Sequence, residues 1–271
     1  MITFRSKLKK LINNVLNLFD IGIEKKSKLT RIKNNELLIR DYGLLNHLDD
    51  LDMRLKYIEN LNHSKSQLRQ DLFVLNELNY KRNGFFVEFG ATNGIDLSNT
   101  YLLENKFDWD GLLSEPAKVW HESLFNNRKC KIDKNCIWKK SGEKINFKEV
   151  SKPEFSTIDS FSNKDQNKYL RDNCQTYQVG SLSLMDFLEK YKAPLIIDYL
   201  SIDTEGSEYS ILRNFDFKKY IFKVITVEHN FTDNREKIFQ LLTNNGYCRK
   251  YEDLSIQDDW YVYTKNLFGN S

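Results

Sequence analysis

Apolar residues repeat with two different periods along the chain of 271 residues, and the change of period divides it. Over residues 1–65 they recur every three or four positions, which is typical of one face of a helix. From Gln70 onward, short apolar runs such as "GFFVEFG" and "IIDYLSID" alternate with helical segments. Strands that alternate with helices indicate a mostly parallel sheet with helices on both faces. We therefore predict a helical extension over 1–65 and an α/β domain over 66–271.

The elements of this domain follow one another along the sequence. Helices are predicted over "DLFVLNEL", 98–105, 117–126 and "NREKIFQLLTNNGY", and Ser183 is placed to cap the helix "SLMDFLEKY". The last two predicted strands have no helix between them, which indicates an antiparallel hairpin at one edge of the sheet. The predicted strands are "GFFVEFG", "WDGLLSEP", "KIDKNCIW", "KINFKEV", "IIDYLSID", "KVITVEHN", "YCRKYE" and "DDWYVYTK".

The segment 151–180 is polar and shows no regular period. A loop of that length is uncommon in a compact domain unless it covers a binding site. We therefore expect Tyr169, Arg171 and Tyr177 to lie on a lid over the acceptor substrate. An ordinary surface loop is the alternative.

Two apolar repeats lie in the N-terminal region. The first has basic residues between its apolar positions, and it predicts either weak contact of residues 1–20 with a membrane surface or packing on protein. The second keeps a 4-3 spacing from Leu37 to Ile58, which predicts a helical hairpin or a homodimer contact through residues 30–62. No run approaches the roughly 18 apolar residues that are needed to span a bilayer.

Composition narrows the choice of partner and compartment. The 41 basic and 38 acidic side chains give a formal net charge of +3, which is too balanced for a protein whose main partner is nucleic acid. The four cysteines are scattered without a C-x-x-C pair, so neither a zinc site nor a disulfide framework is indicated. The N-terminus lacks a cleavage signature. We therefore expect a soluble, cytoplasmic protein.

The stretch "FVEFGATNG" places candidate chemistry at a strand-to-helix turn. Gly90 and Gly94 bound the turn, and Glu88 precedes it by two residues. A nicotinamide dinucleotide would require G-x-G-x-x-G, and a carboxylate is unfavourable beside a pyrophosphate. A carboxylate suits a cationic amine, and Glu115 at the end of the next strand is placed to accept the two hydroxyl groups of a ribose. An amine and a ribose without phosphate indicate S-adenosylmethionine; an ordinary turn is the alternative.

The block "YLSIDTEGSEYSIL" supplies three acids after a buried strand. Asp203, Glu205 and Glu208 are unfavourable there unless they hold a cation or move protons. Glu208 also suits the first turn of the following helix, where acids are favourable. A rival hypothesis treats Asp203 and Glu205 as the metal clamp of a nucleotide-sugar glycosyltransferase, but it leaves the glycine turn unexplained.

The next strand ends in "TVEHN", with Glu228, His229 and Asn230. A lone histidine is more often structural, but this position makes His229 a candidate general base that Glu228 or Asp203 would orient. In the competing hypothesis Asp203, Glu205 and Glu228 bind Mg²⁺ or Mn²⁺, since these cations prefer oxygen ligands.

Blocks from "QDLFVLNEL" through "GFFVEFGATNGIDLSNTYLLE", "GLLSEP", "IDYLSIDTEGSEYSIL" and "ITVEHN" to "DDWYVY" resemble the FkbM-type methyltransferases over roughly residues 67–264. The resemblance implies a class I S-adenosylmethionine-dependent O-methyltransferase with a seven-stranded, Rossmann-like fold. It also implies an acceptor hydroxyl on a sugar, in a surface polysaccharide or a glycosylated metabolite. The alternative is a catalytically inert methyltransferase-like module. The presence of the turn glycines and of Glu115 argues against it.

Taken with the resemblance, the motifs define three sets of candidate residues. The cofactor set comprises Glu88, Gly90, Ala91, Asn93, Gly94, Ser98, Glu115 and Asp203. The catalytic set comprises Asp203, Glu205 and His229. The substrate set comprises Glu208, Asn230, Asp259 and Trp260, the last two because an aromatic face beside carboxylates suits a sugar. Thr92 and Asn93 stand where many relatives carry an Asn-Asp pair, so hydrogen bonding around the methionine end of the cofactor is expected to differ.

Overall fold

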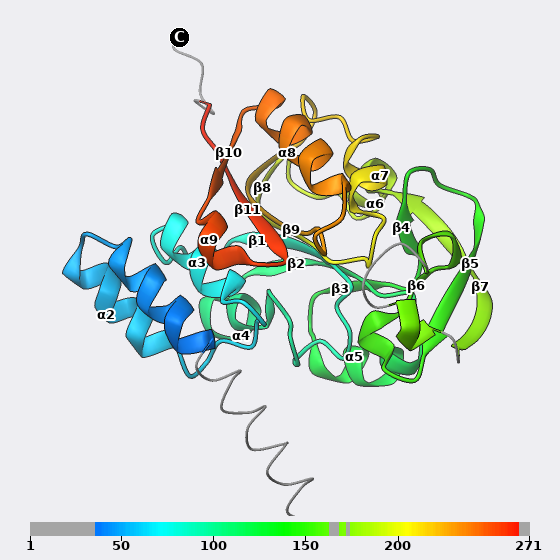
Figure 1. Ribbon diagram of the computed structural model, residues 1–271, viewed down its shortest axis with the longest axis horizontal. Coiled ribbons are helices and arrows are strands. Elements are labelled where there is room, and N and C mark those ends of the chain that lie inside the picture. The colour runs from blue at the N-terminus through cyan, green and yellow to red at the C-terminus, as the bar shows by residue number, and fades with distance from the viewer. Residues whose placement is uncertain (1–35, 163–167, 172–173, 266–271) are drawn as a thin grey trace, which may run out of the picture. The chain divides into compact units, whose positions relative to one another are not determined.

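The computed structural model describes residues 36–162, 168–171 and 174–265 (Figure 1). The predicted membrane contact of residues 1–20 lies outside this part. The chain divides into two compact units, Met1–His47 and Leu48–Ser271, and each is described by itself. In the first unit, residues 36–46 are helical. Residues 48–65, which the sequence assigns to the extension, belong to the same unit as the sheets.

A seven-stranded sheet forms the centre of the second unit, in the order β10-β11-β9-β8-β1-β2-β3. Five neighbouring strands are parallel, and β11 runs antiparallel to both β9 and β10. This sheet confirms the seven-stranded class I methyltransferase fold that the resemblance implies. The antiparallel pair at one edge confirms the hairpin that was predicted from the last two strands. The strands are β1 (Phe85–Phe89), β2 (Asp110–Ser114), β3 (Lys131–Asp133), β8 (Ile196–Ile202), β9 (Ile221–Glu228), β10 (Tyr247–Lys250) and β11 (Asp258–Tyr263).

The strand order reverses at β1, which lies between β2 and β8. The backbone register aligns Phe89 with Ser114 on one side and with Ile202 on the other. Because the three strands are parallel and end level, the next residues of each strand meet at one edge. In open α/β sheets such a switch point is where ligands bind.

Helices cover both faces of this sheet (Figure 1). One face carries α6 (Leu184–Lys190), α7 (Glu208–Leu212) and α8 (Asn234–Asn244), and the other carries α3 (Gln70–Glu77), α4 (Tyr101–Phe107) and α5 (His121–Asn127). The α6–α8 face packs on a core that contains Phe187, Leu200, Ile225 and Leu242, all fully buried. The predicted cap of α6 is confirmed, since the Ser183 hydroxyl accepts a hydrogen bond from the amide of Asp186. A further short helix, α9 (Glu252–Ser255), lies between β10 and β11.

A second, four-stranded sheet corrects two expectations. Its order is β4-β7-β5-β6, with β4 (Cys136–Trp138), β5 (Lys144–Val150), β6 (Thr157–Ile158) and β7 (Cys174–Ser183). "KIDKNCIW" is therefore not one strand, because the chain bends at 134–135 and continues in the other sheet. The segment 151–180 is not irregular throughout, because residues 174–180 belong to β7, which pairs with β5. Short 3-10 helices lie at η1 (Lys118–Trp120), η2 (Pro153–Phe155), η3 (Asp159–Phe161) and η4 (Lys168–Arg171).

The apolar repeat from Leu37 to Ile58 does not follow one continuous helix. The first helix ends at residue 46, and α2 (Leu51–Asn60) begins after Asp50, whose side chain accepts a hydrogen bond from the amide of Asp52. On α2, Leu51 and Ile58 are more than half exposed. The homodimer contact through residues 30–62 stays a prediction.

Candidate active site

The turn after β1 depends on its two glycines. Gly90 has φ +77°, and a Cβ added there would lie 2.0 Å from the backbone oxygen of Asp203. Gly94 has φ +83°, and an added Cβ would lie 2.7 Å from side-chain atoms of both Leu124 and Arg128. Positive φ already favours glycine, and the close approach of neighbouring chain leaves no room for a side chain. The glycine turn is therefore packed tightly against the end of β8.

Glu115 lies beside this turn, at the end of β2. Its two carboxylate oxygens accept hydrogen bonds from the backbone amides of Thr92 and Ala117, each at 2.8 Å. Burial raises the pKa of Glu115 to about 7, although the two amides lower it. Each oxygen retains a further lone pair. The side chain is thus fixed in position and can still accept hydroxyl donors, as a ribose site requires.

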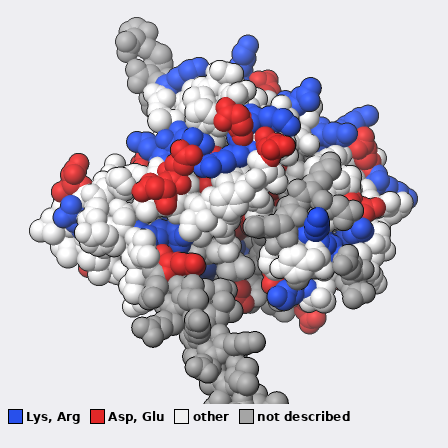
Figure 2. Space-filling model, viewed as in Figure 1, with Lys and Arg blue, Asp and Glu red and all other residues white. Residues whose placement is uncertain are grey.

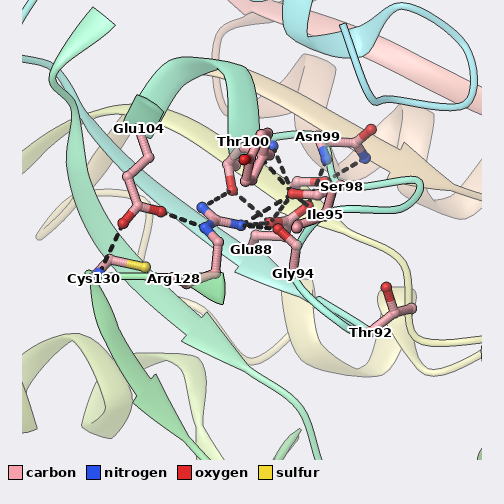
Figure 3. Close-up of polar contacts among 12 residues, drawn as sticks. Glu88, Thr92, Gly94, Ile95, Ser98, Asn99, Thr100, Glu104, Arg128 and Cys130 are labelled. Atoms are coloured by element: carbon pink, nitrogen blue, oxygen red, sulfur yellow. Dashed lines mark hydrogen bonds and ion pairs between the residues drawn. The ribbon is translucent and has the colours of Figure 1, made fainter. Parts of the chain in front are cut away.

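Glu88 occupies the centre of an internal network (Figure 3). Its carboxylate accepts hydrogen bonds from the amide of Asn99 at 2.7 Å, from the hydroxyl of Thr100 at 2.5 Å and from that of Ser98 at 3.1 Å. The Nη1 atom of Arg128 lies 3.6 Å away. Glu88 and Ser98, both predicted to contact the cofactor, therefore hold the segment that follows the turn.

Arg128 is the main residue of this network that the sequence analysis missed (Figure 3). Its guanidinium donates to the backbone oxygen of Gly94 at 3.2 Å and to the hydroxyl of Thr100 at 2.8 Å, and it forms an ion pair with Glu104. The side chain is fully buried. No local pattern around "FNNRKC" marks it, because its partners lie in β1, in α4 and in the segment between them.

The other predicted turn residues are held locally. The side-chain oxygen of Asn93 accepts hydrogen bonds from the amides of Ile95 and Asp96, at 2.9 and 2.8 Å. Ala91 is buried, and its oxygen accepts from the amide of Gly94. These contacts fix the turn without any ligand.

Three acids meet at the ends of β8 and β9. Asp203, Glu205 and Glu228 each place a carboxylate oxygen within 4.8 Å of the other two. Burial raises the pKa of Asp203, and burial together with the nearby Asp203 raises that of Glu228 well above its usual value. Atom Oε2 of Glu228 is buried without a hydrogen-bond partner. The three carboxylates therefore converge, and burial beside Asp203 disfavours the ionised form of Glu228.

Glu205 is already paired with a cation. Its Oε2 lies 2.8 Å from Nη2 of Arg171, whose Nε donates to the backbone oxygen of Phe155 at 2.9 Å. The hydroxyl of Thr157 donates to the backbone oxygen of Glu205 at 2.9 Å. Arg171 thus reaches the acids from the segment that was predicted to cover the site. The other two residues named there differ, since Tyr169 is exposed and Tyr177 lies in β7.

Two further substrate candidates shape the same edge. Oε1 of Glu208 accepts hydrogen bonds from the amides of Thr204 and Gly206, at 3.0 and 2.9 Å. Glu208 therefore stabilises the start of α7, as the alternative for this residue anticipated. The side-chain amide of Asn230 donates to Glu205 at 3.4 Å.

His229 lines the same cleft as Glu228, and its ring nitrogens lie near groups other than the three acids. Its Nδ1 accepts a hydrogen bond from the amide of Phe231 at 3.0 Å, and its Nε2 lies 3.7 Å from Oδ1 of Asp259. Asp259 in turn binds Arg235 and Arg249. The structure therefore pairs His229 with Asp259, while Glu228 pairs with Asp203.

The expectation that Trp260 lines a sugar-binding mouth is corrected. Trp260 is fully buried and stacks on Phe73 of α3, with ring centroids 4.7 Å apart. Its position in β11, between β9 and β10, places it beneath a helix instead of at the sheet's end. Asp259 is likewise buried, within the arginine cluster.

An open cleft of about 610 Å³ lies next to the acids. Its lining includes Glu228 and Asn230 from the end of β9 and Tyr209 from α7. On the face shown in Figure 2, basic and acidic side chains are interspersed over the visible described surface. Within the part of the chain that the structure describes, no helix has the length and apolar character to cross a membrane.

Comparison with known proteins gives one family match. The model described as "Methyltransferase FkbM domain" matches residues 88–248, more than half of the chain. That span includes the glycine turn, Glu115 and the three converging acids. No curated protein matches the chain.

Several solved structures are similar at low identity. Methyltransferase FkbM from Methylobacillus flagellatus KT is 12% identical, with 83% of this chain and 58% of that chain covered and a TM-score of 0.41. Precorrin-6y C5,15-methyltransferase from Geobacter metallireducens GS-15 is 12% identical over 66% of this chain and 71% of that chain, with a TM-score of 0.35. A SAM-dependent methyltransferase from Aquifex aeolicus is 9% identical over 73% and 93%, with a TM-score of 0.34.

Proposed function

Because more than half of its length matches the family model, the chain belongs to the FkbM methyltransferase family, and we propose that it transfers a methyl group from S-adenosylmethionine to a hydroxyl group of a sugar. The observation that carries the proposal is the placement of Glu115. A buried carboxylate, held by two backbone amides beside a glycine turn, fits a ribose diol. Sugar as the acceptor class rests on the family resemblance and on the open polar cleft beside the acids.

The chain offers distinct positions for the parts of the cofactor. Glu115 would accept the ribose hydroxyls, and Gly90 and Ala91 would allow close approach of the backbone. Asp203 is the better placed acid for the cationic amine, because Glu88 already accepts three hydrogen bonds and faces Arg128. When bound, S-adenosylmethionine supplies an electrophilic methyl group on a sulfonium.

The acceptor hydroxyl has to lose a proton as it is methylated. We assign this role to the Asp203–Glu228 pair, which shares a proton at the junction of the turn and the cleft. Two coupled carboxyls titrate as a unit. The raised pKa values bring the pair closer to neutral pH, where proton acceptance is most effective. His229, which faces Asp259, is assigned to the support of that buried cluster.

Mg²⁺ or Mn²⁺ remains a second way to activate the hydroxyl. The all-oxygen donor set of Asp203, Glu205 and Glu228 fits such a cation, and it would lower the pKa of a hydroxyl bound to it. Arg171 already neutralises Glu205, which favours the proton-sharing pair. Full turnover in excess chelator would remove the metal version, whereas loss of turnover that only Mg²⁺ or Mn²⁺ restores would remove the metal-free version.

The glycosyltransferase alternative is not retained, because the family match includes both the glycine turn and the acidic block. An inert binding module stays open until turnover is measured. Transfer of labelled methyl groups from S-adenosylmethionine to a glycan panel would exclude it.

The test of the cofactor site is calorimetric titration with S-adenosylhomocysteine. We expect saturable binding that Glu115→Ala weakens at least tenfold and Glu115→Gln weakens less, since Gln keeps one acceptor oxygen. Glu122→Ala is the matched control, because Glu122 is an exposed acid on the neighbouring α5. Absence of binding to a folded wild-type protein would overturn the proposal.

A further inference from the structure

The open cleft beside Glu228 has two walls that carry similar features. One wall comes from the end of β4, with Trp138 and Lys139. The other comes from α7 and α8, with Tyr209 and Lys237. Each lysine lies beside an aromatic ring, because Nζ of Lys139 is 5.2 Å from the ring centre of Trp138 and Nζ of Lys237 is 5.7 Å from that of Tyr209.

Some lysines of the molecule are neutralised by buried acids. Lys81 and Lys223 both pair with Asp198, and Lys190 pairs with Asp133, at 2.6 to 2.8 Å. In contrast, neither lysine of the cleft forms an ion pair with a carboxylate of the described residues. Within the described residues, Nζ of Lys237 donates a hydrogen bond to the neutral side chain of Asn234, at 3.3 Å. Both side chains are exposed and line the cleft, so a ligand bound there can reach them.

The acids of the cleft do not offset these charges fully. Glu208 is engaged by the amides of Thr204 and Gly206. Glu228 is buried and lies close to Asp203 and Glu205, so it presents little of its carboxyl group to the cleft. Asp233, at the start of α8, is the remaining exposed carboxylate in the lining.

We propose that this cleft binds an acceptor sugar with an anionic substituent, a carboxylate or a phosphate, which Lys139 and Lys237 recognise. A sugar ring presents apolar C–H groups that pack on an aromatic face such as that of Tyr209, and a fixed anion gains from two cations in a partly enclosed site. The lysines orient the sugar so that one hydroxyl lies near Glu228. This inference rests on the proposed methyl transfer for its use, but not for the binding itself.

The test measures binding of matched probes to the intact chain saturated with S-adenosylhomocysteine. The acidic probes are methyl β-glucuronide and glucose 6-phosphate, and the neutral probe is methyl β-glucoside. We expect the acidic probes to bind at least tenfold more tightly. The double substitution Lys139→Ala and Lys237→Ala removes this preference and leaves the neutral probe unchanged, whereas Lys237→Arg retains it.

Lys218→Ala is the control, since Lys218 is exposed but does not line the cleft. Equal binding of acidic and neutral probes, no binding of the acidic probes, or an unchanged preference in the double variant overturns the inference. Preference for only one acidic probe identifies carboxylate or phosphate as the substituent. Failure of S-adenosylhomocysteine to bind would instead contradict the proposed function, and the probes can then be measured on the chain alone.

Discussion

The two sides of the candidate active site differ in how completely their polar groups are paired. Around the glycine turn, both oxygens of Glu115 accept from backbone amides, and Glu88 accepts three hydrogen bonds and faces Arg128. Around the acids, Oε2 of Glu228 is buried without a partner, and burial raises the pKa of Asp203. The chain alone supplies partners for both carboxylates of the first side, whereas a proton or a ligand has to supply the partner of Glu228 on the second.

This difference matches the roles that we propose for the two sides. A cofactor binds more tightly to a turn that needs no further ordering. Proton transfer needs carboxyls whose pKa values lie nearer to neutral pH, and such values arise where charge is buried and poorly compensated. We therefore expect substitutions on the turn side to change stability and cofactor affinity together, and substitutions among the acids to separate stability from activity.

The largest effect is expected from Gly90→Ala. The added Cβ would lie 2.0 Å from the oxygen of Asp203, and φ of +77° is itself unfavourable for alanine. The end of β8 would have to move, so we predict a loss of more than about 4 kcal/mol in the free energy of unfolding and loss of S-adenosylhomocysteine binding. Denaturant unfolding and calorimetry measure the two quantities.

Gly142→Ala provides the control for backbone strain alone. Gly142 has a similar φ of +80°, but nothing lies within 4 Å of an added Cβ. We expect a loss of about 1 kcal/mol and unchanged cofactor binding. Equal effects at the two glycines would show that the contact with Asp203 does not hold the turn.

The next largest effect is expected from Arg128→Met. It leaves the buried carboxylates of Glu88 and Glu104 without their cation. Removal of one partner from a buried ion pair typically destabilises a protein by about 3–5 kcal/mol. Arg82→Met is the matched control, since Arg82 pairs with Asp108 on the surface and such pairs contribute about 0–1 kcal/mol. Similar losses in both variants would contradict the supporting role of Arg128.

The sequence predicts the fold well because its signals are local. Buried strands such as Phe85–Phe89 are short apolar runs, and helix starts such as Ser183 carry their own caps. The glycine turn and Glu115 were found for the same reason, because they follow β1 and β2, which are consecutive in the chain and adjacent in the sheet. Strand β7 was missed because its polar sequence "CQTYQVGSLS" is partly exposed on both faces.

The contacts that complete the site could not be predicted. Arg128 meets Glu88 and Arg171 meets Glu205 over 40 and 34 positions of the chain, and an isolated arginine carries no local sign of its partner. The contact of His229 with Asp259 depends on β11, which lies beside β9 in the sheet but 30 residues later in the chain. Which arginine pairs with which acid is therefore determined by the tertiary structure and not by the local sequence.

Glu228→Gln tests whether ionisation of the buried Glu228 destabilises the folded protein. The pKa of Glu228 in the folded protein lies well above its ordinary value of 4.5, so the folded state binds more protons than the unfolded state between these values. Stability of the wild type therefore falls as pH rises through that window. Gln can still donate to Asp203, and it has no proton to lose. We predict that the variant becomes more stable than the wild type at pH 8, by at least about 1 kcal/mol, and that methyl transfer falls.

Thermal unfolding from pH 5 to pH 8 measures this difference. Glu236→Gln, an exposed position on α8, is the control and should follow the wild type at every pH. Parallel profiles of stability against pH for Glu228→Gln and the wild type would show that ionisation of Glu228 does not destabilise the folded protein.

The smallest expected effect is the pH dependence of cofactor binding that Glu115 causes. It distinguishes the turn side from the acids most directly. Its pKa of about 7 means that the side chain is largely neutral at pH 6 and largely ionised at pH 8. Since a carboxylate accepts hydroxyl donors better than the neutral acid, affinity for S-adenosylhomocysteine should rise up to about tenfold from pH 6 to pH 8. Asp203→Asn should keep this dependence, and Glu115→Ala should lose it. A flat profile in the wild type would mean that the amides of Thr92 and Ala117 keep Glu115 ionised throughout. The turn side would then be complete in charge as well as in hydrogen bonds, and the contrast with the acids would be larger still.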